Sequence, residues 1–111
     1  MSLPLLIAQH QDAIETLCRE YGVSRLDVFG SATTSAFDSQ RSDVDFLVEF
    51  LPGVDLGPWM KSYFELRDAL SSLLRRDVDL VLAENVKNPY LHQSIKQTRQ
   101  TVYASQVPEA A

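Results

Sequence analysis

Two aspartates open the segment with the clearest strand pattern, in the sequence Asp43-Val44-Asp45. In a strand, residues i and i+2 point to the same face, with their Cα atoms about 6.6–6.8 Å apart. Two carboxylates at that separation repel each other by roughly 2.5 kcal/mol at an effective dielectric constant of about 20. Because a fold gains nothing from this repulsion, the pair predicts a hard divalent cation. Mg²⁺ accepts carboxylate oxygens and keeps positions for water or phosphate.

A third carboxylate comes from the next predicted strand, where Asp79 alternates with apolar residues. Three carboxylates can hold two metal ions about 3.5–4 Å apart, the arrangement used for in-line phosphoryl displacement. Asp77 lies on the same face and is the alternative for this role, although its place beside Arg75 and Arg76 favours a surface ion pair. A solvated strand face is the simpler interpretation of all these acids.

Gly30 and Ser31 follow the first predicted strand. A glycine there lets the backbone approach a ligand closely, and a helix that begins at Ser31 would direct its free N–H groups at an anion such as a phosphate. The simpler interpretation is a strand-to-helix turn with a capping serine. Together with Ser42-Asp43-x-Asp45 at the head of the next strand, however, the pair becomes a strong signal for such an anion site.

Hydrophobic spacing predicts strands interleaved with helices. Helices are expected at 4–20, 56–74 and 89–103 and, as a short piece, at 31–37, with strands at 25–29, 43–50 and 77–82. This alternation is typical of one α/β sheet that helices cover on at least one face.

Length and composition limit the function. A chain of 111 residues has room for one core, expected at 1–104 with a frayed tail at 105–111. The net charge of −5 argues against nucleic acid as the main ligand. A single cysteine, Cys18, excludes an internal disulfide and fits a reducing compartment. Since the sequence has neither an apolar run of about 18 residues nor a signal peptide pattern, a cytoplasmic protein with no membrane segment is expected.

The combined motifs resemble a known family. Gly30-Ser31, then after eleven residues DVDFLV at 43–48, and then VDLV at 78–81, are similar to the DNA polymerase beta nucleotidyltransferase superfamily. The resemblance is strongest to its minimal members, the MNT proteins, which include antitoxins paired with HEPN-domain toxins. It covers about 5–104 and implies a small nucleotidyltransferase fold, in which helices flank a mixed sheet of three or more strands.

The resemblance also implies a role for each residue. Gly30 and Ser31 would hold the triphosphate, and Asp43 and Asp45 would bind two Mg²⁺ ions, with Mn²⁺ as an alternative. Asp79 would be the third metal-site carboxylate and would deprotonate or orient the attacking hydroxyl. The reaction would move a nucleoside monophosphate from an NTP, expected to be ATP, and release pyrophosphate. In antitoxins of this kind the acceptor is a tyrosine of the HEPN partner, and adenylylation silences a ribonuclease.

Two departures from the family pattern keep other functions open. Ser35 stands where many members have glycine, and the loop from Ser31 to Asp43 is one residue longer than usual. The first alternative is an antitoxin that acts by binding alone, with weak or lost catalysis. The second is transfer to a small molecule such as an aminoglycoside, which is disfavoured because such enzymes carry a further domain. For a protein acceptor, Trp59, Tyr63 or the last helix would join the interface if exposed. A homo-oligomer is left open.

Overall fold

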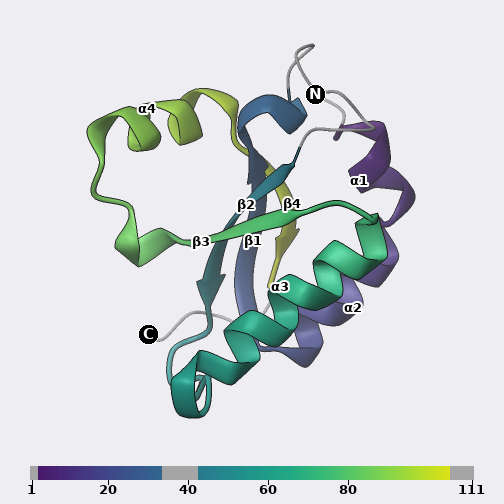
Figure 1. Cartoon of the computed structure of the whole chain (residues 1–111), viewed down its shortest axis with the longest axis vertical. Helices are drawn as coiled ribbons and strands as arrows, with labels where there is room; N and C mark the ends of the chain where they lie inside the picture. Colours follow the sequence, from purple (N-terminus) through teal and green to yellow (C-terminus); the bar gives the residue numbers. More distant parts are fainter. Residues whose placement is uncertain (1–2, 34–42, 106–111) are drawn as a thin grey trace.

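A four-stranded mixed sheet forms the centre of the molecule (Figure 1). The computed structural model describes residues 3–33 and 43–105 of the 111. The strands are β1 (Val23–Phe29), β2 (Val44–Phe50), β3 (Val78–Leu82) and β4 (Gln100–Ala104), in the spatial order β3-β2-β1-β4. β1 runs antiparallel to β2 and β4, and β2 runs parallel to β3. The predicted α/β class, with helices around a mixed sheet, is confirmed.

One face of the sheet carries the main core. The helices α1 (Leu5–Gln9), α2 (Gln11–Glu20) and α3 (Lys61–Leu74) pack on this face. From β2 it receives Val44, Phe46 and Val48, all fully buried. Because side chains alternate along a strand, the intervening residues of β2 must point to the opposite face.

The opposite face is only partly covered. The helix α4 (Pro89–Thr98) packs there through Ile95 onto Phe29 and Leu47, and these three form a second, smaller cluster. Figure 1 shows α4 on the far side of the sheet from α2 and α3. The polar residues of this face therefore stay accessible: Asp43 and Asp79 are exposed and Asp45 is half-buried.

Two predicted helices differ at their boundaries. The segment 4–20 is two helices that meet at His10. There the backbone N–H of His10 donates to the Ile7 carbonyl rather than to the Leu6 carbonyl, whose oxygen lies 2.9 Å from Nδ1 of the His10 imidazole. The predicted helix at 56–74 begins only at Lys61, because Trp59 and Met60 have φ values of 57° and 56°. An α-helix cannot continue through that left-handed backbone.

The prediction of a helix to residue 103 is wrong beyond Thr98. Arg99 is extended, and the next five residues form β4 along β1. The helical spacing of Ile95 and Val102 is coincidental, since Val102 enters the main core from the sheet. The Ser105 N–H continues this edge by donating to the Ser24 carbonyl.

Other expectations fall wholly or partly outside the described residues. Of the predicted short helix at 31–37, the structure describes a 3₁₀ turn at Gly30–Thr33, and the rest lies in 34–42. The predicted tail lies outside as well, apart from Ser105. Among the described helices, none has the length and apolar character needed to cross a membrane.

Candidate active site

The strand register brings together three of the five predicted site residues. Phe29 pairs with Asp45 across β1 and β2, and Asp45 pairs with Asp79 across β2 and β3. Gly30, which follows Phe29 directly, is therefore a neighbour of Asp45. Asp43 immediately precedes β2 and lies two residues before Asp45, on the same face. The predicted residues thus share one end of the central strands.

The backbone of Gly30 lies close to the carboxylate of Asp45. The φ of Gly30 is +73°, a conformation that L side chains rarely adopt. A Cβ atom at this position would lie 3.0 Å from Oδ2 of Asp45. The backbone therefore favours glycine at position 30, and any side chain there would also require the Asp45 carboxylate to shift.

Asp45 carries the electrostatic cost of the site. Burial, then the negative charge of Asp79 and then that of Asp43, raise the pKa of Asp45 from its ordinary value of 3.8 to about 6. The sequence predicted the repulsion between neighbouring carboxylates, but the largest cause is burial. A bound cation would oppose all three effects.

The carboxylates fit Mg²⁺ by the chemistry of their donor atoms. Asp43, Asp45 and Asp79 offer the hard oxygens that this ion prefers, and burial beside the charges of Asp79 and Asp43 gives Asp45 a raised pKa that a bound cation would lower. Within residues 3–33 and 43–105, no three His, Cys, Asp or Glu side chains already stand close enough to hold a metal. Because the register places Asp45 and Asp79 side by side, closing around an ion would require side-chain rotation but no change of register.

Asp79 is favoured over Asp77 as the third carboxylate. Asp79 faces Asp45 in the register and raises its pKa, whereas Asp77 is not among the causes of that shift. Asp77 precedes β3, and its carbonyl accepts a hydrogen bond from Val44 N–H. The predicted pairing of Asp77 with Arg75 or Arg76 is not found among the ion pairs of the described residues.

The predicted phosphate site is described only in part. Ser31 belongs to the 3₁₀ turn, and its role in phosphate binding stays a prediction. Ser35 and Ser42 lie outside the described residues. The effect of serine in place of glycine at position 35 therefore also stays a prediction.

A buried ion pair beside the site was missed from the sequence. Asp27 is fully buried, and its carboxylate accepts hydrogen bonds from Nε of Arg25 at 3.0 Å and from Nε of Arg99 at 2.6 Å. The available signal was an aspartate inside an apolar strand, because such a charge requires a partner.

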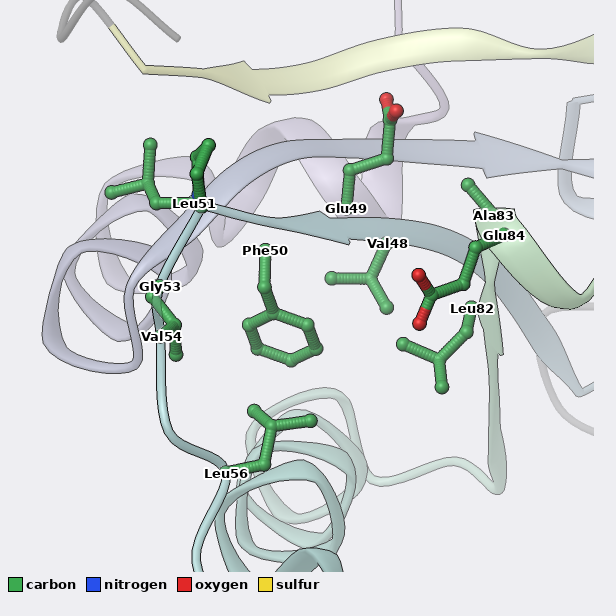
Figure 2. A pocket seen from close by; sticks show the side chains of 11 residues that line it. Val48, Glu49, Phe50, Leu51, Gly53, Val54, Leu56, Leu82, Ala83 and Glu84 are labelled. Carbon is green, nitrogen blue, oxygen red and sulfur yellow. The ribbon is translucent and has the colours of Figure 1, made fainter. Parts of the chain in front are cut away.

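Two pockets border the sheet away from Asp45. The larger, of about 490 Å³, lies around the end of β2, where the side chains of Val48, Phe50, Leu82 and Glu84 share one side of the strand and Glu49 points to the other (Figure 2). The described residues that line it include no lysine, arginine or histidine, so they offer no counter-charge to a triphosphate. The other, of about 360 Å³, is lined by α4 and by β2, with Lys96 and Arg99 in its wall. It lies on the same sheet face as Asp45.

The family follows from the sequence match. Residues 11–102 match the nucleotidyltransferase domain family, and the chain belongs to it. The predicted class is therefore confirmed.

Relatives support the same class. A candidate protein adenylyltransferase of Methanocaldococcus jannaschii is 41% identical over 81 residues, which is 73% of this chain and 78% of the relative. Another from the same organism is 32% identical over 78 residues, covering 70% and 75%.

Solved structures share the fold. A structure described as that of a candidate minimal nucleotidyltransferase matches with a TM-score of 0.65 and 32% identity, over 90% of this chain and 95% of the other. A toxin–antitoxin complex with AMP-PNP matches with a TM-score of 0.63 and 24% identity, over 86% of this chain and 74% of the other. A tri-AMPylated Shewanella oneidensis HEPN toxin in complex with an MNT antitoxin matches with a TM-score of 0.61 and 22% identity, over 90% of this chain and 74% of the other. At these identities the last two establish only the fold.

Proposed function

We propose that this nucleotidyltransferase moves AMP from ATP to a hydroxyl of a partner protein, with Mg²⁺ as its cofactor. The observation that carries the proposal is the register that sets Gly30, Asp45 and Asp79 side by side at the open face of the sheet. The names of the Methanocaldococcus jannaschii relatives, candidate protein adenylyltransferases, support the transferred group and the protein acceptor.

Each residue has a distinct task in this proposal. Asp43, Asp45 and Asp79 would hold two metal ions, and Mg²⁺, or Mn²⁺ in its place, would neutralise the triphosphate charge. Gly30 lets the turn lie against Asp45, which keeps the phosphate-binding backbone and the carboxylates in one place. Asp79 accepts the proton of the acceptor hydroxyl while the hydroxyl oxygen forms its bond to the α-phosphorus. The bond from the α-phosphorus to the bridging oxygen breaks, and pyrophosphate leaves.

The acceptor must arrive on another molecule. With a single small sheet and one helix over the site face, the described chain leaves the carboxylates open to a partner. A similar fold occurs in a complex with an AMPylated HEPN toxin, and we propose a HEPN-domain protein as the partner here, with a tyrosine as acceptor. Acting on such a toxin in the cytoplasm, the chain would be its antitoxin.

A binding-only antitoxin is the second candidate function. Ser35 in place of the family's usual glycine favours it. In that case the chain would neutralise its partner through contact alone. Transfer to a small molecule is a weaker alternative.

One assay separates the enzyme from the binding protein. The chain is incubated with labelled ATP, Mg²⁺ and the product of the adjacent gene, and the products are examined by mass spectrometry. An AMP adduct on a partner tyrosine, absent with Asp43→Ala/Asp45→Ala, is the expected result. A tight complex without modification, and full neutralisation by the double variant, would overturn the enzymatic proposal in favour of binding alone.

A further inference from the structure

Threonine hydroxyls from two parts of the chain hold the two backbone groups of Gly30. The Gly30 N–H donates to Oγ1 of Thr98 at 2.7 Å, across 68 residues of sequence. The Gly30 carbonyl accepts a hydrogen bond from Oγ1 of Thr33 at 2.9 Å. The turn that begins the predicted phosphate site is therefore tied at its first residue to the last residue of α4.

The hydroxyl of Thr98 is oriented for this contact. It donates its proton to the Ser94 carbonyl at 2.7 Å, which leaves its lone pairs to accept from Gly30. A hydroxyl offers one donor and two acceptor positions. Serine at position 98 could make both bonds, whereas valine, which has nearly the same shape as threonine, could make neither.

The end of α4 that carries Thr98 is anchored on both sides. Three residues earlier, Ile95 is buried against Phe29 and Leu47. One residue later, Arg99 donates to the buried carboxylate of Asp27. Since both anchors contact the sheet itself, the Thr98 hydroxyl has a fixed position relative to β1 and β2.

We propose that Thr98 is a positioning residue for the nucleotide, and this inference rests on the proposed function. Through the Gly30 N–H it sets the distance between the 30–33 turn and Asp45, whose Oδ2 lies 3.0 Å from the place of a Cβ at Gly30. Reacting groups displaced by about 1 Å can lose about a hundredfold in rate. Gly30 then acts through its conformation, and its N–H is engaged by Thr98 while residues that follow it in the turn meet the phosphates.

The test compares Thr98→Val with Thr98→Ser. Thr16→Val is the matched control, because the Thr16 hydroxyl makes the same kind of bond one helical turn back, to Asp12, on the exposed side of α2. The full-length chain is titrated by calorimetry with a non-hydrolysable ATP analogue in the presence of Mg²⁺. Amide hydrogen exchange at Gly30 is measured on the same samples, and KM for ATP is measured with the partner protein.

The expected pattern separates the hydroxyl from the rest of the side chain. Thr98→Val raises Kd and KM for the nucleotide about tenfold and speeds Gly30 exchange by a similar factor, because a donor loses its acceptor. Thr98→Ser stays within about twofold of the natural protein, and Thr16→Val changes neither quantity.

Two results would overturn the inference while leaving the proposed function intact. One is natural nucleotide affinity and natural Gly30 exchange in Thr98→Val. The other is damage in Thr98→Ser as large as that in Thr98→Val, because serine keeps the hydroxyl and the effect would then not follow the hydrogen bonds. If the natural protein itself binds no nucleotide, the proposed function fails and this inference fails with it.

Discussion

At the scale of single residues, Asp45 combines partial burial with two like-charged neighbours. Its pKa of about 6 lies above the ordinary value of 3.8, so the folded chain holds this proton more tightly than the unfolded chain does. Between those two pH values the native state binds more protons, and the free energy of unfolding must fall as pH rises. Above pH 6 the charged Asp45 lowers the free energy of unfolding of the metal-free protein.

Removing this charge should therefore stabilise the metal-free chain at neutral pH. We expect Asp45→Asn to raise the free energy of unfolding at pH 7.5 by about 1 kcal/mol, a value reduced from the full pKa shift because Asp45 is partly solvated. At pH 3, below both pKa values, the difference should disappear. Urea unfolding at both pH values measures it, with Glu49→Gln, an exposed acid on the same strand, as the control. Equal or lower stability of Asp45→Asn at pH 7.5 would contradict the electrostatic account.

Binding of Mg²⁺ and ATP should offset this destabilisation and raise the free energy of unfolding. With Mg²⁺ and ATP at a hundred times the dissociation constant, the native state gains about 2.7 kcal/mol by mass action. Thermal melting with and without Mg²⁺ and ATP should show the shift in the natural chain and lose it in Asp43→Asn/Asp45→Asn. A shift of the same size in the double variant would exclude these carboxylates as the metal site.

Asp79 should matter for turnover more than for affinity. A group that takes a proton in the transition state contributes about 10²- to 10⁴-fold, and such a loss falls on kcat. We expect Asp79→Asn to lose activity in that range with little change in nucleotide affinity. Asp77→Asn is the matched variant two residues earlier. Normal turnover of Asp79→Asn together with an inactive Asp77→Asn would assign the role to Asp77.

At the scale of elements, local sequence patterns predicted correctly those strands and helices whose tertiary packing favours the same structure. The alternation in β2 predicted which face carries Asp43 and Asp45 because the apolar residues of the same strand fill the main core. β4 was missed because helical spacing continues past Thr98, and only pairing with β1, some 70 residues away in sequence, decides the strand.

The candidate site was predictable by residue type but not by contact. Asp79 could be named from its strand, yet its pairing with Asp45 depends on the parallel register of β2 and β3, which no local pattern encodes. The bond from Gly30 to Thr98 and the pair of Asp27 with Arg99 have the same origin. Each joins residues far apart in sequence, so only the assembled fold reveals it.

The Asp27 ion pair should be a major link between α4 and the sheet. Arg99→Gln leaves a fully buried carboxylate with Arg25 as its remaining charged partner. Breaking a buried pair on one side costs about 3–5 kcal/mol, and we expect about 2–3 because Arg99 is partly solvated. Arg19→Gln, which removes an exposed pair with Glu15, should change stability by less than about 0.5 kcal/mol. Urea unfolding that ranks the two variants equally would contradict this link.

At the scale of the whole molecule, the two faces of the sheet have separate tasks. Within residues 3–33 and 43–105, three helices and most of the buried apolar residues lie on one face, while the other face carries a single helix and the acidic site. Among the residues that the structure describes, the most exposed large apolar side chains are Trp59, at 94%, and Tyr90, at 86%. Of the candidates predicted for the partner interface, Trp59 is therefore exposed and the last helix presents the exposed Tyr90, whereas Tyr63 is half-buried and donates a hydrogen bond to the Leu80 carbonyl.

Their places in the fold favour Tyr90. It lies in the first turn of α4, the helix that covers the site face. The last residue of α4, Thr98, accepts the hydrogen bond from Gly30. Thr98 is eight residues further on, about 12 Å along the helix axis. Trp59 precedes α3, which packs on the opposite face and begins at the far end of the molecule from the 30–33 turn (Figure 1). A partner whose hydroxyl must reach Asp79 would contact α4 more readily than the start of α3.

Tyr90→Ala should thus weaken the complex with the partner by about thirtyfold, the effect of removing an aromatic anchor worth about 2 kcal/mol. Trp59→Ala is the control, and it should change affinity by less than about twofold. Since both side chains are exposed, neither substitution should lower the melting temperature, which separates lost contact from lost fold. Affinity is measured by calorimetry with the product of the adjacent gene, and AMP transfer is followed on the same samples. Strong loss with Trp59→Ala and none with Tyr90→Ala would place the partner at the start of α3. An acceptor that docks there would have to reach around the sheet edge to meet Asp79.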